Sequence, residues 1–279
     1  MRRSTSWAAP LGACAAAIVL TVVVCSLLAG SRPTVAGPTS TPSLADTEVR
    51  GFVSLPASLP RYGCAVPAIE EGDPASMAAF MGTLTDCLDT TWRATLGGAF
   101  TRPDRVFWDS PGRSPCGDFP ASGASAFYCP TNQGMYIGTA DVVKASGYAP
   151  VWQFSIYGRV LAHEYAHHVQ NAAGILTAAW QLRASADAAR ANELTRRAEL
   201  QAQCLAGVYF HAVRLAPPLS AELWESALED SRARGEDAKP EEERNHGSGA
   251  SYAGWLDRGF TTGTPSACDT WTVSSAEVS

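Results

Sequence analysis

VLAHEYAHHVQ, residues 160–170, contains the pattern His-Glu-x-x-His, with histidines at His163 and His167. Residues four apart lie on one face of an α-helix, so these two imidazoles can reach a single point. Imidazole nitrogens are good ligands for Zn²⁺, and two of them leave a tetrahedral site half filled. Glu164 lies about 100° round the helix from His163, where its carboxylate can reach a water on the metal without ligating the metal. The stretch therefore predicts a zinc site with Glu164 as the general base.

The alternative to a metal site is a surface helix that carries two histidines and a glutamate by chance, and the flanking residues argue against it. Val160, Leu161, Ala166 and Val169 are apolar, which predicts a largely buried helix. A buried helix keeps polar side chains together only where something satisfies them. The flanks favour the metal site.

A catalytic zinc site needs a third protein ligand, and the sequence offers several candidates. His168 is adjacent to His167 and is expected to point away from the metal, while His211 and His246 lie further along the chain. A carboxylate on a second helix is the other possibility, and Glu199 is favoured because its neighbours are apolar. Spacing alone does not separate a ligand at Glu199 from an exposed helix glutamate.

The N-terminus predicts that the folded part of the chain lies outside the cytoplasm. The 279 residues carry a formal net charge of −6, which gives no support for a nucleic-acid partner. Basic residues precede an apolar run at residues 7–29, long enough to cross a bilayer once. We expect residues 1–30 to be a signal anchor or a cleaved signal peptide, so the protein is either single-pass in the cell membrane with an extracytoplasmic C-terminal domain or secreted. Residues 31–60 are a predicted Ser/Thr/Pro-rich linker, 61–271 the folded domain and 272–279 a polar tail that frays.

The predicted domain holds six cysteines, an even number that indicates disulfides in an exported protein. Buried free thiols are the alternative, and a thiolate zinc site is disfavoured because no Cys-x-x-Cys pair occurs. We expect pairing in sequence order, namely Cys64–Cys87, Cys116–Cys129 and Cys204–Cys268.

Hydrophobic periodicity predicts an α+β fold in which a small β-sheet packs on a helical core. Helices are expected at residues 74–96, 150–173, 177–213, 220–232 and 251–260, and strands at 105–108, 126–129 and 134–138. An edge strand of this sheet could pair with an extended peptide substrate, unless the hairpin is purely structural.

Residues 160–170, together with ELQAQCLAG at 199–207, resemble the bacterial neutral zinc metallopeptidases. Members of that family carry His-Glu-x-x-His-His-x-Gln and then Glu-Leu-Gln-Ala-Asp-Cys-x-Ala-Gly on the next helix. The likeness covers residues 90–271 and includes the blocks at 128–137 and 246–270. It implies a zincin-like fold, with His163, His167 and Glu199 as zinc ligands and Glu164 as general base.

This chain departs from the family pattern at Gln203, where members have Asp. A carboxylate one turn after Glu199 would accept a hydrogen bond from the ring N–H of a ligand histidine and raise its basicity. Gln203 can accept through its amide oxygen but has no charge, so the site is either weaker or uses another orienting group.

The sequence thus predicts an extracytoplasmic zinc-dependent peptidase that acts on a peptide or protein substrate. His246 is the candidate for stabilising the oxyanion, against a loop histidine without a catalytic role, and Tyr252 is a weaker candidate. The alternatives are a zinc-binding scaffold whose site has decayed, and a metal-dependent amidase acting on a cell-wall peptide.

Overall fold

The computed structural model describes residues 58–70, 72–119, 125–139 and 154–279. The predicted N-terminal membrane or signal segment, most of the predicted linker and the start of the expected helix at residues 150–173 lie outside these ranges. Within them, none of the helices combines the length and the hydropathy that a membrane crossing requires.

Six α-helices form most of the described part of the chain, and α4 (Phe154–Ala172) lies among them. Every residue from 155 to 170 is buried, as the apolar flanks of the histidine pattern predict. α2 (Pro74–Leu96) and α6 (Ala188–Ala212) pack against α4, and α8 (Gly249–Thr262) packs along α6. α7 (Ala221–Ala233) contacts both α4 and α8. The predicted positions of α2, α4, α7 and α8 are confirmed.

The prediction of a single helix at residues 177–213 is wrong. The chain forms α5 (Ile175–Ala184), breaks, and starts again at α6. Asp187 caps the new helix, because its side chain accepts a hydrogen bond from the backbone N–H of Arg190 at 2.8 Å. The Ala-rich composition favours helix throughout, but Ser185 and Asp187 can satisfy the backbone locally and so permit the break. α6 then ends one residue earlier than expected, where β7 (Val213–Ala216) begins.

A three-stranded sheet lies on α4 and has the strand order β2-β6-β5. β2 (Asp104–Trp108) pairs in parallel with β6 (Gly134–Gly138), and β6 pairs antiparallel with β5 (Ala126–Cys129). The three predicted strands are confirmed, and β5 is an edge strand. A short hairpin of β3 (Gly112–Ser114) and β4 (Gly117–Phe119) extends from this sheet.

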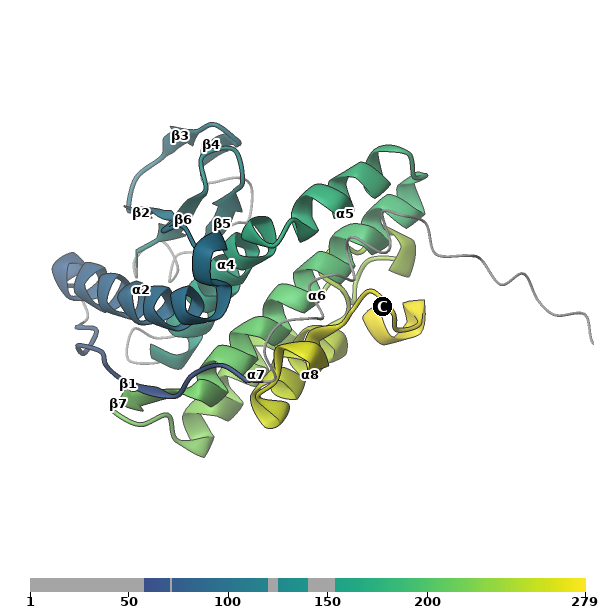
Figure 1. Ribbon diagram of the computed structural model, residues 1–279. Coiled ribbons are helices and arrows are strands. Elements are labelled where there is room, and N and C mark those ends of the chain that lie inside the picture. Colours follow the sequence, from purple (N-terminus) through teal and green to yellow (C-terminus); the bar gives the residue numbers. More distant parts are fainter. Residues whose placement is uncertain (1–57, 71, 120–124, 140–153) are drawn as a thin grey trace, which may run out of the picture. The chain divides into compact units, whose positions relative to one another are not determined.

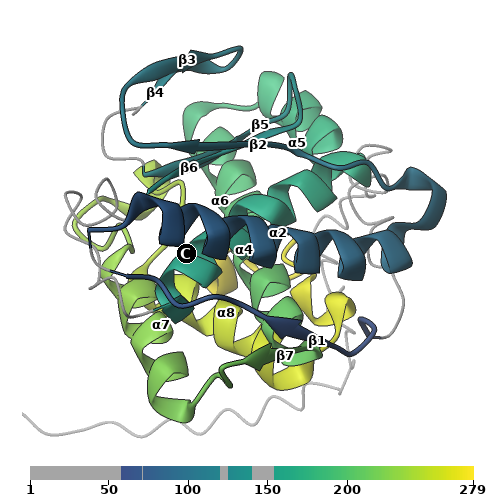
Figure 2. The same ribbon diagram turned by 90° about the vertical axis from the view of Figure 1, so that its left-hand side faces the viewer.

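A second pair of strands was not expected from the sequence. β1 (Tyr62–Ala65) pairs in parallel with β7, which follows α6. Figures 1 and 2 show this pair and the three-stranded sheet on opposite sides of α2. The α+β class with small sheets on a helical core is therefore confirmed.

Three disulfides join the elements, and they are the three predicted pairs. Cys64–Cys87 ties β1 to α2, Cys116–Cys129 ties the β3–β4 hairpin to β5, and Cys204–Cys268 ties α6 to the C-terminal segment.

The expectation that residues after Thr270 fray is wrong. Val278 is fully buried, and Trp255 Nε1 donates to the carbonyl of Glu277 at 2.9 Å. Ser274 and Glu277 form a capping box around a short 3₁₀ turn. The polar composition of the tail hides these backbone contacts, which need partners on α6 and α8.

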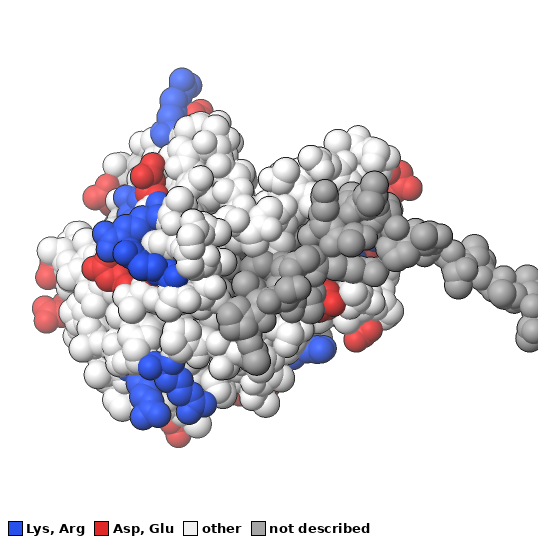
Figure 3. All heavy atoms as spheres, viewed as in Figure 1, with Lys and Arg blue, Asp and Glu red and all other residues white. Residues whose placement is uncertain are grey.

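The surface is hollowed between the sheet and α5, as the space-filling view shows (Figure 3). The side chains exposed on this part of the face are uncharged, whereas arginines and acidic residues are interspersed elsewhere on it. β5 and α5 both contribute residues to a cavity on this side of α4.

Candidate metal centre

The structure brings the three predicted ligands together from two helices. His163 and His167 lie one turn apart on α4, and Glu199 faces them from α6. Glu199 Oε2 is 3.1 Å from His163 Nε2 and 3.3 Å from His167 Nε2, and the two Nε2 atoms are 3.2 Å apart. These atoms form a His-His-Glu group that could hold a metal ion.

The other ring nitrogen of His167 is fixed by Gln170. His167 Nδ1 lies 2.8 Å from Gln170 Oε1, and the Gln170 amide nitrogen donates to the carbonyl of Ala198 and to Gln201 Oε1. Because two acceptors surround the Gln170 nitrogen, its oxygen must face the ring. His167 therefore keeps a proton on Nδ1 and directs Nε2 at the cluster.

Gln203 holds His163 in the same way. Its Oε1 lies 2.8 Å from His163 Nδ1, and its amide nitrogen donates to Ser231 Oγ at 3.1 Å. The Arg159 guanidinium approaches the same Oε1 at 3.5 Å, which also requires oxygen at that position. The neutral amide thus fills the place of the family carboxylate and orients the ring, so no other orienting group is needed at His163.

Three hydrogen-bond acceptors, the two Nε2 atoms and Glu199 Oε2, therefore face one another with no proton between them unless a positive charge is supplied. Burial lowers the pKa of His163 to about 4. Burial also acts against a charge on His167, but the Glu199 carboxylate outweighs it and raises the pKa of His167 to about 9. Either a proton or a metal cation relieves this convergence, and the donor set of two imidazoles and one carboxylate is one that zinc prefers.

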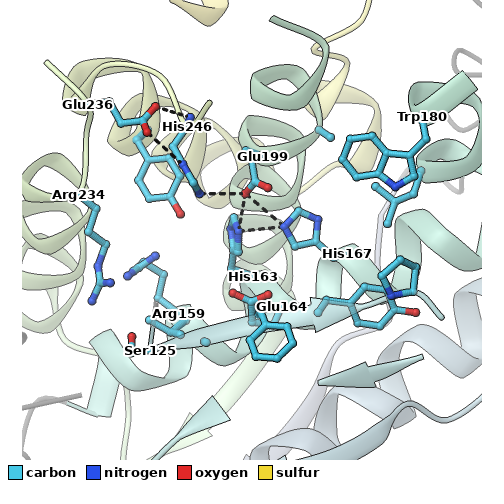
Figure 4. Close-up of a pocket in the computed structure, with 18 residues that line it drawn as sticks. Ser125, Arg159, His163, Glu164, His167, Trp180, Glu199, Arg234, Glu236 and His246 are labelled. Carbon is cyan, nitrogen blue, oxygen red and sulfur yellow. Dashed lines mark hydrogen bonds and ion pairs between the residues drawn. The ribbon is translucent and has the colours of Figure 1, made fainter. Parts of the chain in front are cut away.

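Glu164 lies beside the cluster without joining it. Figure 4 shows Glu164 and Glu199 on opposite sides of His163. The Glu164 side chain lines the cavity over the cluster, and burial raises the pKa of the Glu164 carboxyl to about 7. A carboxylate with this pKa can take up and release a proton near neutral pH.

His246 reaches the edge of the cluster from the loop before α8. Its Nε2 lies 3.7 Å from Glu199 Oε2, and its Nδ1 lies 3.6 Å from Glu236 Oε1. Burial acts to lower the pKa of His246, but the two carboxylates raise it overall. Glu236 also accepts from the backbone N–H of His246 at 2.8 Å and so fixes this segment. Glu236 is not predicted from the sequence, because it lies in a charged stretch that is typical of a solvated loop.

A cavity of about 470 Å³ opens over these groups. Residues of β5, α4, α5 and α6 line it together with the loop that carries His246. Tyr252 also lines it, with its ring 6.0 Å from that of His163 between centroids. Two arginines at one end, Arg159 and Arg234, were also missed, since no local pattern connects them.

The other candidate histidines lie apart from the cluster. His168 Nδ1 lies 3.1 Å from Tyr128 Oη, and its Nε2 lies 2.9 Å from the carbonyl of Thr101. His211 Nδ1 lies 2.7 Å from the carbonyl of Phe260. Both contact other parts of the fold. His168 thus points away from the metal cluster as expected, and the candidate His211 does not join it.

Comparison with known proteins finds a family that matches most of the chain. The family described as "Putative neutral zinc metallopeptidase" matches residues 66–271. The uncharacterized protein YpfJ of Escherichia coli K12 is 29% identical over 244 residues, which cover 75% of this chain and 82% of YpfJ. The uncharacterized protein Rv2575 of Mycobacterium tuberculosis H37Rv is 33% identical over 211 residues, which cover 67% of this chain and 68% of Rv2575. No solved structure matches the chain. Because this match covers most of the chain, including both helices of the cluster, the chain belongs to the family described as "Putative neutral zinc metallopeptidase".

Proposed function

We propose that this protein is an extracytoplasmic zinc-dependent peptidase. The observation that carries the proposal is the convergence of His163, His167 and Glu199 on one point, with the Glu164 carboxyl beside them. These three residues would hold the zinc, which when bound polarises a carbonyl and lowers the pKa of water. Family membership supports the same activity.

Glu164 is the general base in this proposal. Its carboxylate takes a proton from the attacking water and passes it to the leaving amine. Burial favours the neutral form of Glu164, so the carboxyl gives up its proton only near pH 7. His246 would place a positive charge beside the cluster, where an oxyanion forms during peptide hydrolysis.

β5 would bind the substrate backbone. In the antiparallel β5–β6 pair the Gly138 N–H donates to the Ser125 carbonyl, so every second residue from Ser125 onward bonds to β6. Ala126 and Tyr128 lie between these residues, and their backbone N–H and C=O groups point to the free edge of β5. Both residues line the cavity. An extended peptide added at this edge would pass over the cluster, and its backbone hydrogen bonds would position the cleaved bond.

The three disulfides support a location outside the cytoplasm, since such bonds persist in oxidising compartments. The apolar run at residues 7–29 would export the domain and either anchor it as a single-pass protein or be cleaved.

Metal analysis and a protease assay on the purified domain test the function. We expect one zinc per chain, cleavage of a casein-type substrate, and loss of cleavage with retained zinc in Glu164→Gln. Glu199→Ala should lose the zinc as well. Glu229→Gln on α7 is the matched control, because Glu229 is exposed and does not line the cavity. Stoichiometric zinc with no turnover on any peptide library would favour a binding scaffold instead.

A further inference from the structure

The cavity over the metal cluster has a polar end and an apolar end. Trp180 lies on one side of His167 (Figure 4). Apart from the cluster and Glu164, the charged and histidine side chains that line the cavity lie on the other side, namely Arg159, Arg234, Glu236 and His246. Leu176, one turn before Trp180 on α5, lines the same cavity. The end that α5 forms therefore offers apolar surface to whatever occupies the cavity.

Trp180 is exposed although its side chain is large and apolar. Within the described ranges it is the one large hydrophobic residue left exposed, at 39%. The Arg183 guanidinium lies over its ring, 5.5 Å from the ring centroid, but Arg183 does not line the cavity over the cluster. A tryptophan on a cavity wall is typical of a binding surface, because it buries a large area on contact and loses little conformational entropy.

The backbone that carries Trp180 is held firmly on the helices of the metal cluster. Gly174, with a φ of 78°, makes the left-handed turn that separates α4 from α5. Ile175 and Ala179 lie one turn apart on α5 and are fully buried, and α5 packs on both α4 and α6. The apolar wall thus stands beside the cluster before any substrate arrives, which lowers the entropy cost of binding.

The direction of β5 relates the apolar wall to the polarity of the substrate. Ser125, which precedes β5, lies on the same side of the cluster as Arg159 (Figure 4). An extended chain advances by about 3.3 Å per residue, so β5 crosses the cavity between Ser125 and Pro130, both of which line it. An antiparallel partner is the more stable addition to a sheet edge, and its chain would run opposite to β5. The part of the substrate that precedes the cleaved bond would then lie toward Trp180.

We propose that Trp180 and Leu176 form a subsite for a large apolar side chain, such as Phe or Leu, in the substrate residue before the cleaved bond. The hydrophobic effect drives this recognition, because the side chain covers the exposed part of the Trp180 ring and removes apolar surface from water. Acidic and basic side chains find no opposite charge among the described residues of this wall. The inference rests on the proposed peptidase function and names the substrate class of the same site.

Two series of matched peptides test the proposal. One series carries Phe, Ala or Glu before the cleaved bond, and the other carries the same three residues after it. We expect Phe before the bond to be favoured over Ala in kcat/KM by about tenfold or more. Trp180→Ala should bring this ratio close to one, and Trp180→Phe should retain most of it. Leu182→Ala is the matched control, because Leu182 is a half-buried apolar residue of α5 outside the cavity, and it should leave the ratio unchanged. A preference that survives in Trp180→Ala, or one confined to the residue after the bond, would overturn the proposal.

Binding of the same peptides to zinc-loaded Glu164→Gln protein, followed by fluorescence anisotropy, gives a readout that does not need turnover. Tighter binding of the Phe peptide than of the Ala peptide, lost on adding Trp180→Ala, supports the subsite even where no peptide is cleaved and the peptidase function fails. Cleavage of all peptides at equal rates and with equal affinities would overturn the subsite while leaving the peptidase function intact. Thermal unfolding of each variant checks that a lost preference is not a lost fold.

Discussion

Replacing Gln203 by leucine tests whether a neutral amide prepares His163 for a metal. Gln203 is fully buried, and its Oε1 lies 2.8 Å from His163 Nδ1. Leucine has a similar volume but no acceptor, so the His163 N–H would be buried without a partner, at a cost of about 1–3 kcal/mol. The ring can avoid this cost by moving its proton to Nε2, which removes the lone pair that faces the cluster.

The expected magnitude follows from the role of such partners in metal sites. Loss of a group that orients a ligand histidine lowers metal affinity by about 10–100-fold, or roughly 1.4–2.8 kcal/mol. Gln203→Glu should act in the opposite direction, because a carboxylate there accepts the same hydrogen bond with a charge. The Arg159 guanidinium, 3.5 Å from Gln203 Oε1, would partly neutralise that charge.

The assay is competition for zinc with a chromophoric chelator, combined with denaturant unfolding with and without zinc. Weaker binding reduces the stabilisation that saturating zinc provides. Thr85→Val is the control, because Thr85 is equally buried but its hydroxyl donates to the carbonyl of Met81 and contacts none of the groups that orient the histidines. It should lose stability while zinc affinity stays near the parent value. Wild-type zinc affinity in Gln203→Leu, or an equal loss of affinity in Thr85→Val, would refute the reasoning.

Three further predictions concern Glu164, the α6–α8 contact and the disulfides. Burial raises the pKa of Glu164 to about 7 from 4.5, so ionising it opposes folding as pH rises through that window. The metal-free Glu164→Gln protein should therefore have the same free energy of unfolding as the parent at pH 4, and a free energy higher by on the order of 1–3 kcal/mol at pH 8. An equal difference at the two pH values would contradict this. A Cβ at Gly259 would lie 1.9 Å from the Cys204 carbonyl oxygen, so Gly259→Ala should cost about 1–3 kcal/mol in chemical denaturation. Gly254→Ala on the same helix meets nothing within 4 Å and should be neutral or stabilising, and equal effects of the two would count against the close approach. Removing the Cys204–Cys268 bridge, which joins residues 64 positions apart, should cost about 4 kcal/mol, against about 3 kcal/mol for Cys116–Cys129, which joins residues 13 positions apart. A larger loss from the shorter loop would contradict the chain-entropy account.

Local patterns in the sequence determined the parts of the site that depend on one helix. His163, Glu164 and His167 share a helix whose buried flanks and i, i+4 spacing set their relative positions before any tertiary contact forms. The strands of the hairpin and most helix positions follow from short-range periodicity in the same way. Glu199 was ambiguous on spacing alone, because its exposure depends on which face α6 turns to α4.

Only the tertiary structure decided what surrounds the cluster. The parallel pairing of β1 with β7 joins segments about 150 residues apart, which no local pattern encodes. Arg159 and Arg234 meet at Asp230 because α4 packs on α7, and Glu236 reaches His246 through a loop that composition marks as solvated. Gln203 looks like a loss of charge in the sequence, yet its oxygen takes the orienting position because packing closes Arg159 and Ser231 around the amide. Side-chain roles of this kind depend on distances between helices, and those distances are set by the packing of the whole core.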